Sequence, residues 1–232
     1  MNKISIRTLL PPSVEGASGL IRRKIKWQWM PIHKAQAHLQ LFLSRSHGLL
    51  THLNYPFFMD DNSLAFVAYR APLLEVLHMP NSSWVTDDWV LQLAPMLRSI
   101  TDLDLSGCSG LSHVALEALG KNCRKVTHLR KNRNFFYTHH PCDEEALAIA
   151  QHFPRLQHLE LANAPFSIDG LRAILWGCVA LTSLDLRGRC QHLEMSEVFI
   201  MECKQRLGVF LEPGDDTFLM FDLQGPEDAV VE

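Results

Sequence analysis

The sequence lacks several features that mark common classes of protein. Its formal net charge is −3, without the basic surplus that a nucleic-acid-binding protein uses to neutralise phosphates, so we expect no nucleic-acid partner. No apolar run approaches the length that crosses a bilayer, and we expect no membrane association. Hydrophobic residues at 47% and charged residues at 20% instead predict an ordinary folded protein.

The N-terminal stretch and the cysteines carry no secretory pattern. The segment MNKISIRTLLPPSVEGASGLIRRK contains no sustained apolar run and is interrupted by Pro11 and Pro12, so it does not resemble a signal peptide. The six cysteines form no CxxC pair. We therefore expect reduced thiols and a cytoplasmic or nuclear location.

Motifs of enzyme active sites are also missing. The sequence contains no HExxH, no GxSxG and no GxxxxGK[ST]. The GCSG at Gly107–Gly110 has the wrong spacing for a nucleophile elbow and falls at a predicted strand-to-helix turn. Cys108, Cys123 and Cys178 occupy repeat positions that suit small buried residues better than catalysis. We therefore expect that the protein is not an enzyme and that it has no catalytic residue and no cofactor.

What the sequence does contain is a repeat. The segment LRSITDLDLSGCSGLSHVALEALGKNCRKVTHL begins with an apolar triplet that recurs along the chain, with first positions separated by 24, 26, 26, 30 and 25 residues. These intervals are typical of leucine-rich repeats, apart from one insertion. The copies are Leu50-Leu53-Tyr55, Leu74-Leu77-Met79, Ile100-Leu103-Leu105, the weaker Val126-Leu129-Lys131, Leu156-Leu159-Leu161 and Leu181-Leu184-Leu186.

The intervals between the triplets have helical periodicity, with Thr86, Ser112 and Asp143 as expected N-caps. One strand–turn–helix unit cannot bury its own apolar face, so neighbouring units stack. The sequence therefore predicts an α/β leucine-rich-repeat horseshoe, a solenoid with a parallel concave sheet and convex helices. Upstream, IKWQWM predicts a degenerate further copy whose first position is Lys24.

This pattern divides the chain into three parts. Residues 1–23 have little periodicity, and we expect a flexible segment. Residues 24–210 form the repeat domain. Residues 211–232 contain Glu212, Asp215 and Asp216 but no Lys or Arg, which predicts a solvated acidic tail or cap, partly docked over the last repeat through Phe218, Leu219 and Phe221.

Polar residues alternate with the apolar triplets and should line the concave surface, since strand side chains point to opposite faces in turn. A mixed polar surface of this kind suits recognition of a protein, with a merely solvated face as the alternative. The candidate partner-binding residues on the strands are His52, Asn54, His78, Asp102, Asp104, His128, Arg130, His158, Glu160 and Asp185.

The long interval contains the segment KNRNFFYTHHPCDEE, in which aromatic residues stand beside Lys131 and Arg133. Insertions in repeats map to loops on one face and often bind partners, so Arg133, Phe135 and Phe136 join the candidate site. An equally good reading is that the aromatic residues fill the gap between two repeats.

Twelve histidines raise the question of a metal. His128 and His158 should lie on adjacent strands, about 5 Å apart. Zinc sites, however, require three or four convergent ligands, and His139, His140 and Cys142 form no stronger set. We expect surface histidines and no metal.

Longer segments resemble a known family. LDLSGCSGLSHVALEALGKNCRKVTHLRKN, DEEALAIAQHFPRLQHLEL and GLRAILWGCVALTSLDLRGRC, with IKWQWM upstream, are similar to plant F-box proteins with cysteine-type leucine-rich repeats. The resemblance covers about residues 24 to 210. It implies a substrate receptor of an SCF-type E3 ubiquitin ligase complex, in which the F-box binds a Skp1-like adaptor and the repeats hold the protein to be ubiquitinated.

The sequence departs from this family at its N-terminal side, because an F-box is a helical segment of some forty residues and only residues 1–23 precede the repeat pattern. The resemblance thus implies a protein substrate on the concave face, and a Skp1-like adaptor only if an F-box equivalent exists. Two other hypotheses stay open. One is a small-molecule-sensing repeat protein, which a deep apolar pocket beside residues 131–142 would favour, and the other is a non-functional repeat fragment.

We therefore predict that the 232-residue chain alone does not bind a Skp1-like adaptor. The measurement is a pull-down with purified components, followed by titration of any complex recovered. Binding at about micromolar affinity or tighter would show that another part of the chain replaces the F-box.

Overall fold

The computed structural model describes residues 23–25, 32–55, 58–133, 143–188, 190 and 193–214. The chain divides into two compact units, Met1–Val126 and Thr127–Glu232. Both units consist of the same alternation of short strand and helix. The predicted flexible segment 1–23 lies outside the described residues except for Arg23, and so does the tail from residue 215 onward.

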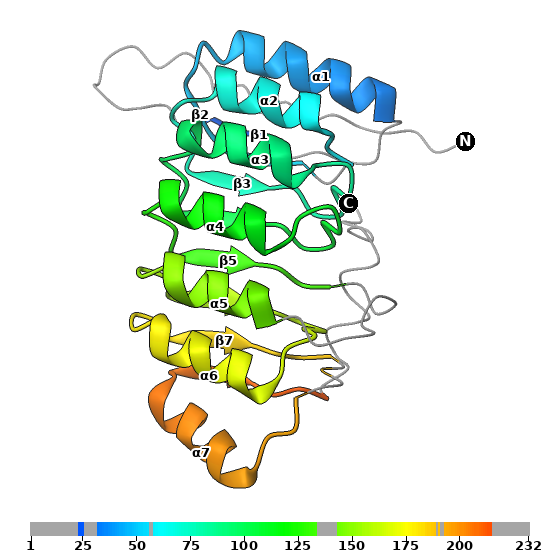
Figure 1. The fold of residues 1–232 in the computed structure, drawn as a ribbon. Helices are drawn as coiled ribbons and strands as arrows, with labels where there is room; N and C mark the ends of the chain where they lie inside the picture. The colour runs from blue at the N-terminus through cyan, green and yellow to red at the C-terminus, as the bar shows by residue number, and fades with distance from the viewer. Residues whose placement is uncertain are drawn as a thin grey trace, which may run out of the picture. The chain divides into compact units, whose positions relative to one another are not determined.

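The first unit has its strands in one layer and its helices on one side of them (Figure 1). The strands are parallel and follow the chain order β1-β2-β3-β4. The elements are β1 (Arg23–Ile25), α1 (Ile32–Arg45), β2 (Leu50–Asn54), α2 (Asp61–Arg70), β3 (Val76–His78), α3 (Asp87–Leu93) with the 3-10 turn η1 (Ala94–Met96), β4 (Asp102–Asp104) and α4 (His113–Asn122).

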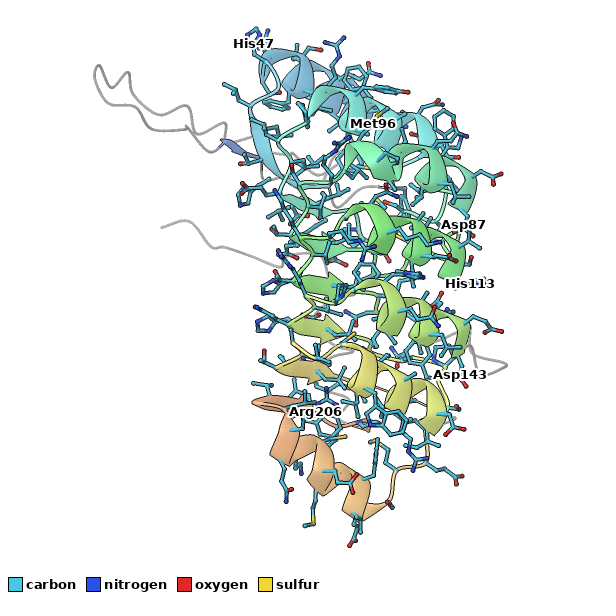
Figure 2. All side chains as sticks on the ribbon, turned by 60° about the vertical axis from the view of Figure 1, so that its left-hand side comes forward. His47, Asp87, Met96, His113, Asp143 and Arg206 are labelled. Carbon is cyan, nitrogen blue, oxygen red and sulfur yellow. The ribbon has the colours of Figure 1, made fainter. Side chains whose placement is uncertain are left out.

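The second unit repeats this arrangement, with parallel strands in the order β5-β6-β7-β8. Figure 2 shows the same two layers after a turn of the molecule, with the side chains added. The elements are β5 (His128–Arg130), α5 (Asp143–His152), β6 (His158–Glu160), α6 (Ile168–Gly177), β7 (Ser183–Asp185), α7 (Glu197–Arg206) and β8 (Val209–Leu211). The α/β leucine-rich-repeat prediction is confirmed.

The apolar triplets hold each unit together, as predicted. Their middle residues pair across neighbouring strands, with Leu53 opposite Leu77 and Leu77 opposite Leu103 in the first unit. In the second unit Leu159 lies opposite both Leu129 and Leu184. All of them are at most 1% exposed. Each buried leucine contributes about 1.5–3 kcal/mol of transfer free energy, so this ladder contributes substantially to stability.

The predicted register of the first strand is wrong by two residues. Ile25 pairs with Leu53, so Ile25 and not Trp27 occupies the second apolar position, and the first position is not Lys24. A shift of two residues leaves every side chain on the same face of a strand. Alternation in IKWQWM therefore could not distinguish the two registers. Trp27 and Trp29 lie outside the described residues.

A further strand, β8, was not recognised in the sequence. Leu207 is buried and Phe210 pairs with Leu184, so these two residues continue the triplet pattern. Leu207 follows Leu181 at the repeat interval, and this spacing was the available signal. The third position of this triplet is Glu212, a charged residue, so the triplet does not match a pattern of three apolar residues.

Two of the three expected N-caps have another role. Ser112 caps α4 by accepting a bond from the Val114 N–H. Thr86 precedes α3 but makes no side-chain cap bond; its N–H and hydroxyl donate instead to Asp61. Asp143 is the first residue of α5, and its carboxylate accepts from a serine of the next repeat.

These aspartates form the same link between neighbouring repeats. Asp87 accepts from the Ser112 N–H at 2.9 Å and its hydroxyl at 2.6 Å, and Asp143 accepts from Ser167 at the same two distances. Both aspartates are labelled in Figure 2. A carboxylate that accepts from a backbone N–H and a hydroxyl forms a strong charge-assisted pair. The link fixes where each successive helix begins.

The cysteines of the repeats are buried, as predicted. The Cys108 thiol contacts the Met79 carbonyl oxygen at 3.2 Å, and the Cys123 thiol contacts the Leu97 carbonyl oxygen at 3.2 Å. Burial raises the pKa of Cys123 and that of Cys178 to about 12, so both thiols are neutral at physiological pH. A neutral, enclosed thiol is a poor nucleophile, which agrees with a packing role.

Replacement of Leu159 by alanine should lower the free energy of unfolding by about 2–5 kcal/mol, because rigid neighbours cannot fill the cavity. Chemical denaturation measures the change. Leu147→Ala is the matched control: Leu147 lies on α5 and is 44% exposed, so its loss should cost less than about 1 kcal/mol. Equal effects of the two substitutions would show that the strand register is wrong.

Cys123 and Cys178 should resist alkylation at pH 8 in the native chain and react fully after denaturation, as followed by peptide mapping. Their pKa is raised to about 12 from the ordinary value of 9.0, so the unfolded state loses these protons first. The contribution of these two protonated thiols to the free energy of unfolding is therefore fully present below pH 9.0. It is lost as the pH rises toward 12. Equal labelling rates in the native and denatured chains would contradict the burial.

Candidate protein-binding surface

The face of the strand layer opposite the helices, called the strand face below, carries the polar residues that alternate with the triplets. Within each unit these residues lie opposite one another in the predicted register. In the first unit His52, Val76 and Asp102 form one row and Asn54, His78 and Asp104 the next. In the second unit the rows are His128, His158 and Ser183, and Arg130, Glu160 and Asp185.

Two side chains of the first unit are joined diagonally. The Nε2 atom of His78 lies 3.1 Å from the Oδ1 atom of Asp102, and both side chains are about one-fifth exposed (21% and 22%). Asp104 accepts a bond from the Ser106 N–H in the turn after β4. His52 contacts the Thr51 hydroxyl through Nδ1, and Asn54 is exposed.

The strand face of the second unit has a denser set of interactions. The rings of His128 and His158 are stacked, with centroids 4.3 Å apart and planes 12° from parallel. Directly beside them, Arg130 Nε donates to Glu160 Oε1 at 3.1 Å, with side chains 27% and 34% exposed. Asn132 donates to the other oxygen of Glu160. Glu160 is thus held between two donors.

Asp185 is on this face but is covered by a residue that the sequence analysis missed. Arg187 binds its carboxylate through Nε and Nη2, the shortest distance being 2.7 Å, and the Asp185 side chain is only 8% exposed. Arg187 follows Asp185 by two residues, so continuing the alternation one step past β7 would have found it. The Arg187 guanidinium, 25% exposed, is the more accessible charged group of this pair.

These side chains surround a depression of about 340 Å³ on the strand face. Polar and charged groups form most of its wall. The apolar part of the wall is formed by strand residues, among them Leu211 of β8. The lining residues are His128, Leu129, Arg130, His158, Leu159, Glu160, Ser183, Asp185, Arg187 and Leu211.

The start of the insertion is tied into the second unit. Arg133 Nη2 lies 2.8 Å from the Oε1 atom of Glu145, whose side chain is 3% exposed. Asn132 Oδ1 accepts from the Ala162 N–H, and Lys131 is buried, at 4% exposure. Phe135 and Phe136 lie outside the described residues, as do His139, His140 and Cys142. Arg133 thus has a structural contact that its place in a polar loop did not predict.

Within the described ranges, no group of three or more His, Cys, Asp or Glu residues is placed to hold a metal ion. His128 and His158, the pair singled out in the sequence, face each other as stacked rings. Among the residues that the structure describes, no helix is long and apolar enough to cross a bilayer.

The repeats match a described family. Residues 86–207, just over half of the 232-residue chain, match the family model "FBD-associated F-box protein At5g56370, LRR repeats". The chain belongs to the plant F-box/leucine-rich-repeat family. This confirms the resemblance found in the segments around Cys108, Cys123 and Cys178.

Individual relatives come from Arabidopsis thaliana. The chain is 34% identical to F-box protein FBW2 over 172 residues, 71% of this chain and 52% of that protein. It is 33% identical to F-box protein SKIP1 over 186 residues, 73% of this chain and 61% of the relative. Putative F-box/LRR-repeat protein 23 is 28% identical over 75% of this chain and 38% of its own length. The chain therefore spans about half the length of these relatives.

A solved structure has the same fold. The crystal structure of the Rad7 and Elc1 complex from yeast contains a chain that matches 80% of this chain and 49% of its own length, with a TM-score of 0.55 and 16% identity. At this identity the likeness concerns the fold, and it supports the α/β repeat of the F-box/leucine-rich-repeat family.

Arg133→Ala should destabilise the protein, because it leaves the buried Glu145 carboxylate without the guanidinium at 2.8 Å. The expected loss is about 3 kcal/mol, measured by chemical denaturation. Arg155→Ala, at an exposed position before β6, is the control and should change stability by less than about 0.5 kcal/mol. If both substitutions have the same small effect, Arg133 has no structural role and is available to a partner.

Proposed function

We propose that this chain is a protein-binding module that holds the substrate of an SCF-type E3 ubiquitin ligase, with the substrate on the strand face. The observation that supports the proposal most strongly is the cluster of partly exposed charges on the second unit, where Arg130 and Glu160 pair across strands beside the stacked His128 and His158. The family supplies the link to ubiquitination, since the relatives are F-box proteins by name.

The charges of this cluster are placed for recognition. The sheet register sets Arg130 opposite Glu160 and Glu160 opposite Asp185, so their positions do not depend on flexible loops. Opposite charges at fixed positions select a complementary surface and penalise a wrong one, because like charges brought together cost several kcal/mol. A partner that supplies a carboxylate near Arg130 or Arg187 and a cation near Glu160 would match this pattern.

The composition of the depression favours a protein over a small molecule. Sites for small molecules are predominantly apolar, with a few polar groups that fix orientation. Here Arg130, Glu160, Asp185 and Arg187 contribute charge to a single depression of about 340 Å³. Protein interfaces readily include such polar groups, together with bridging water.

The proposed role requires no covalent chemistry by this chain. The thiols of Cys123 and Cys178 have pKa values raised to about 12 by burial, which removes them as nucleophiles at neutral pH. Transfer of ubiquitin would be the work of other components of the ligase, and this chain would determine which protein is presented.

Arg130→Glu should weaken binding of the substrate much more than Arg155→Glu does. A central interface charge typically contributes about 2–5 kcal/mol, whereas an exposed peripheral charge mainly changes the association rate. The partner is first recovered by affinity purification in plant cells, scored separately for adaptor, cullin and new proteins. Its affinity for each purified variant is then measured by calorimetry.

A double variant separates binding from folding. Arg130→Glu alone places two carboxylates opposite each other, whereas Arg130→Glu with Glu160→Arg restores the pair across β5 and β6 with its direction reversed. The double variant should regain the thermal stability of the wild type and still bind the partner weakly. Wild-type affinity in both variants would rule out the strand face of the second unit as the recognition surface.

A further inference from the structure

A second surface lies on the opposite side of the second unit, between α6 and α7. Arg172, Leu175 and Trp176 from α6 and Phe199, Glu202, Cys203 and Arg206 from α7 form a groove of about 360 Å³. The floor is apolar, since Leu175, Phe199 and Cys203 are at most 9% exposed. Two guanidinium groups and one carboxylate stand at its edges.

Trp176 makes this groove unusual. Its indole is 73% exposed, although tryptophan carries one of the largest apolar surfaces and is normally mostly buried. On the same helix, α6, the Arg172 guanidinium lies over the ring of Phe199 from α7, 5.6 Å from its centroid. The groove therefore presents an aromatic wall and a positive rim, which together suit an aromatic segment with acidic neighbours.

The chain itself contains such a segment. Residues 215–232 include the apolar run Phe218, Leu219, Met220 and Phe221, followed directly by Asp222. The same stretch has six carboxylates and no Lys or Arg. Its charge is opposite to that of the pair Arg172 and Arg206, and its aromatic residues match the apolar floor.

The described part of the chain delivers this segment close to α7. After β8, Glu212 forms an ion pair with Lys204 of α7, and Lys204 is adjacent to Cys203 and two residues from Arg206. An extended chain covers about 3.3–3.6 Å per residue. The seven residues from Gly214 to Phe221 thus reach roughly 24 Å, more than the interaxial distance of about 8–10 Å between packed helices.

We propose that residues Phe218–Asp222 bind in the groove between α6 and α7, with the phenylalanines against Trp176 and Phe199 and Asp222 beside Arg206. The segment would cover the apolar floor formed by Leu175, Phe199 and Cys203, and removal of apolar surface from water is favourable. Covalent linkage favours this occupant over a free peptide, because a short tether gives a local concentration in the millimolar range. The proposal is independent of what the strand face binds.

Fluorine NMR of the full chain labelled with 5-fluorotryptophan tests the contact. The Trp176 and Trp84 resonances are assigned with Trp176→Phe and Trp84→Phe, and each resonance is measured in H₂O and in D₂O. Trp84, 59% exposed, serves as the internal standard for a solvent-exposed indole. In the wild type the solvent isotope shift of Trp176 should be much smaller than that of Trp84.

The double variant Phe218→Ser with Phe221→Ser should raise the Trp176 isotope shift to the value of Trp84. Arg206→Glu (Arg206 is labelled in Figure 2) should act in the same direction. The matched controls, Tyr69→Ser in the first unit and Arg155→Glu, should leave the Trp176 isotope shift unchanged. A Trp176 shift equal to that of Trp84 in the wild type would overturn the proposal, since the groove is then open. A shift that grows smaller with rising protein concentration would also overturn it, because a second copy then covers the groove.

Discussion

The parallel pairing of leucine against leucine is the constraint on which the rest of the structure depends. Leu53, Leu77 and Leu103 in the first unit, and Leu129, Leu159 and Leu184 in the second, lie opposite their neighbours and are almost completely buried. A slip of one residue would turn all of them to solvent. The hydrophobic effect therefore fixes the register of each strand, and no specific hydrogen bond is needed to select it.

The same constraint creates the strand face, which is the recognition surface proposed above. Once Leu129 and Leu159 are buried, the residues on either side of them must point outward. His128 then meets His158 as a stacked pair, and Arg130 meets Glu160 at 3.1 Å. The buried leucines thus set the backbone positions of the outward polar residues.

The sequence predicted what depends on local pattern. Triplets such as Leu156-Leu159-Leu161 gave the strands, their order and the outward rows, because period and spacing are encoded within each repeat. The packing of Cys123 and Cys178 followed from their equivalent positions. The two-residue error at Ile25 arose because alternation is unchanged by such a shift.

Interactions between distant residues were beyond prediction. The contact of Arg133 with buried Glu145 and the link from Asp143 to Ser167 both depend on three-dimensional proximity. Thr86 was expected to cap its own helix, yet it bonds to Asp61 of the preceding repeat. The residue types predicted polar or helix-initiating positions. Which residue each side chain contacts became known only from the fold. The contact of Arg187 with Asp185 is different, because it joins residues two positions apart and a continued strand alternation would have indicated it.

Side-chain footprinting of the complex tests the central claim, that the strand face binds the substrate. Hydroxyl radicals oxidise exposed side chains, and mass spectrometry reports each site with and without the bound partner. Recognition on the strand face predicts protection of His128, His158 and Arg187, while Tyr69 on α2, 65% exposed, keeps its rate of oxidation. Protection of Tyr69 with unchanged oxidation of His128 and His158 would contradict the account and assign recognition to the helices.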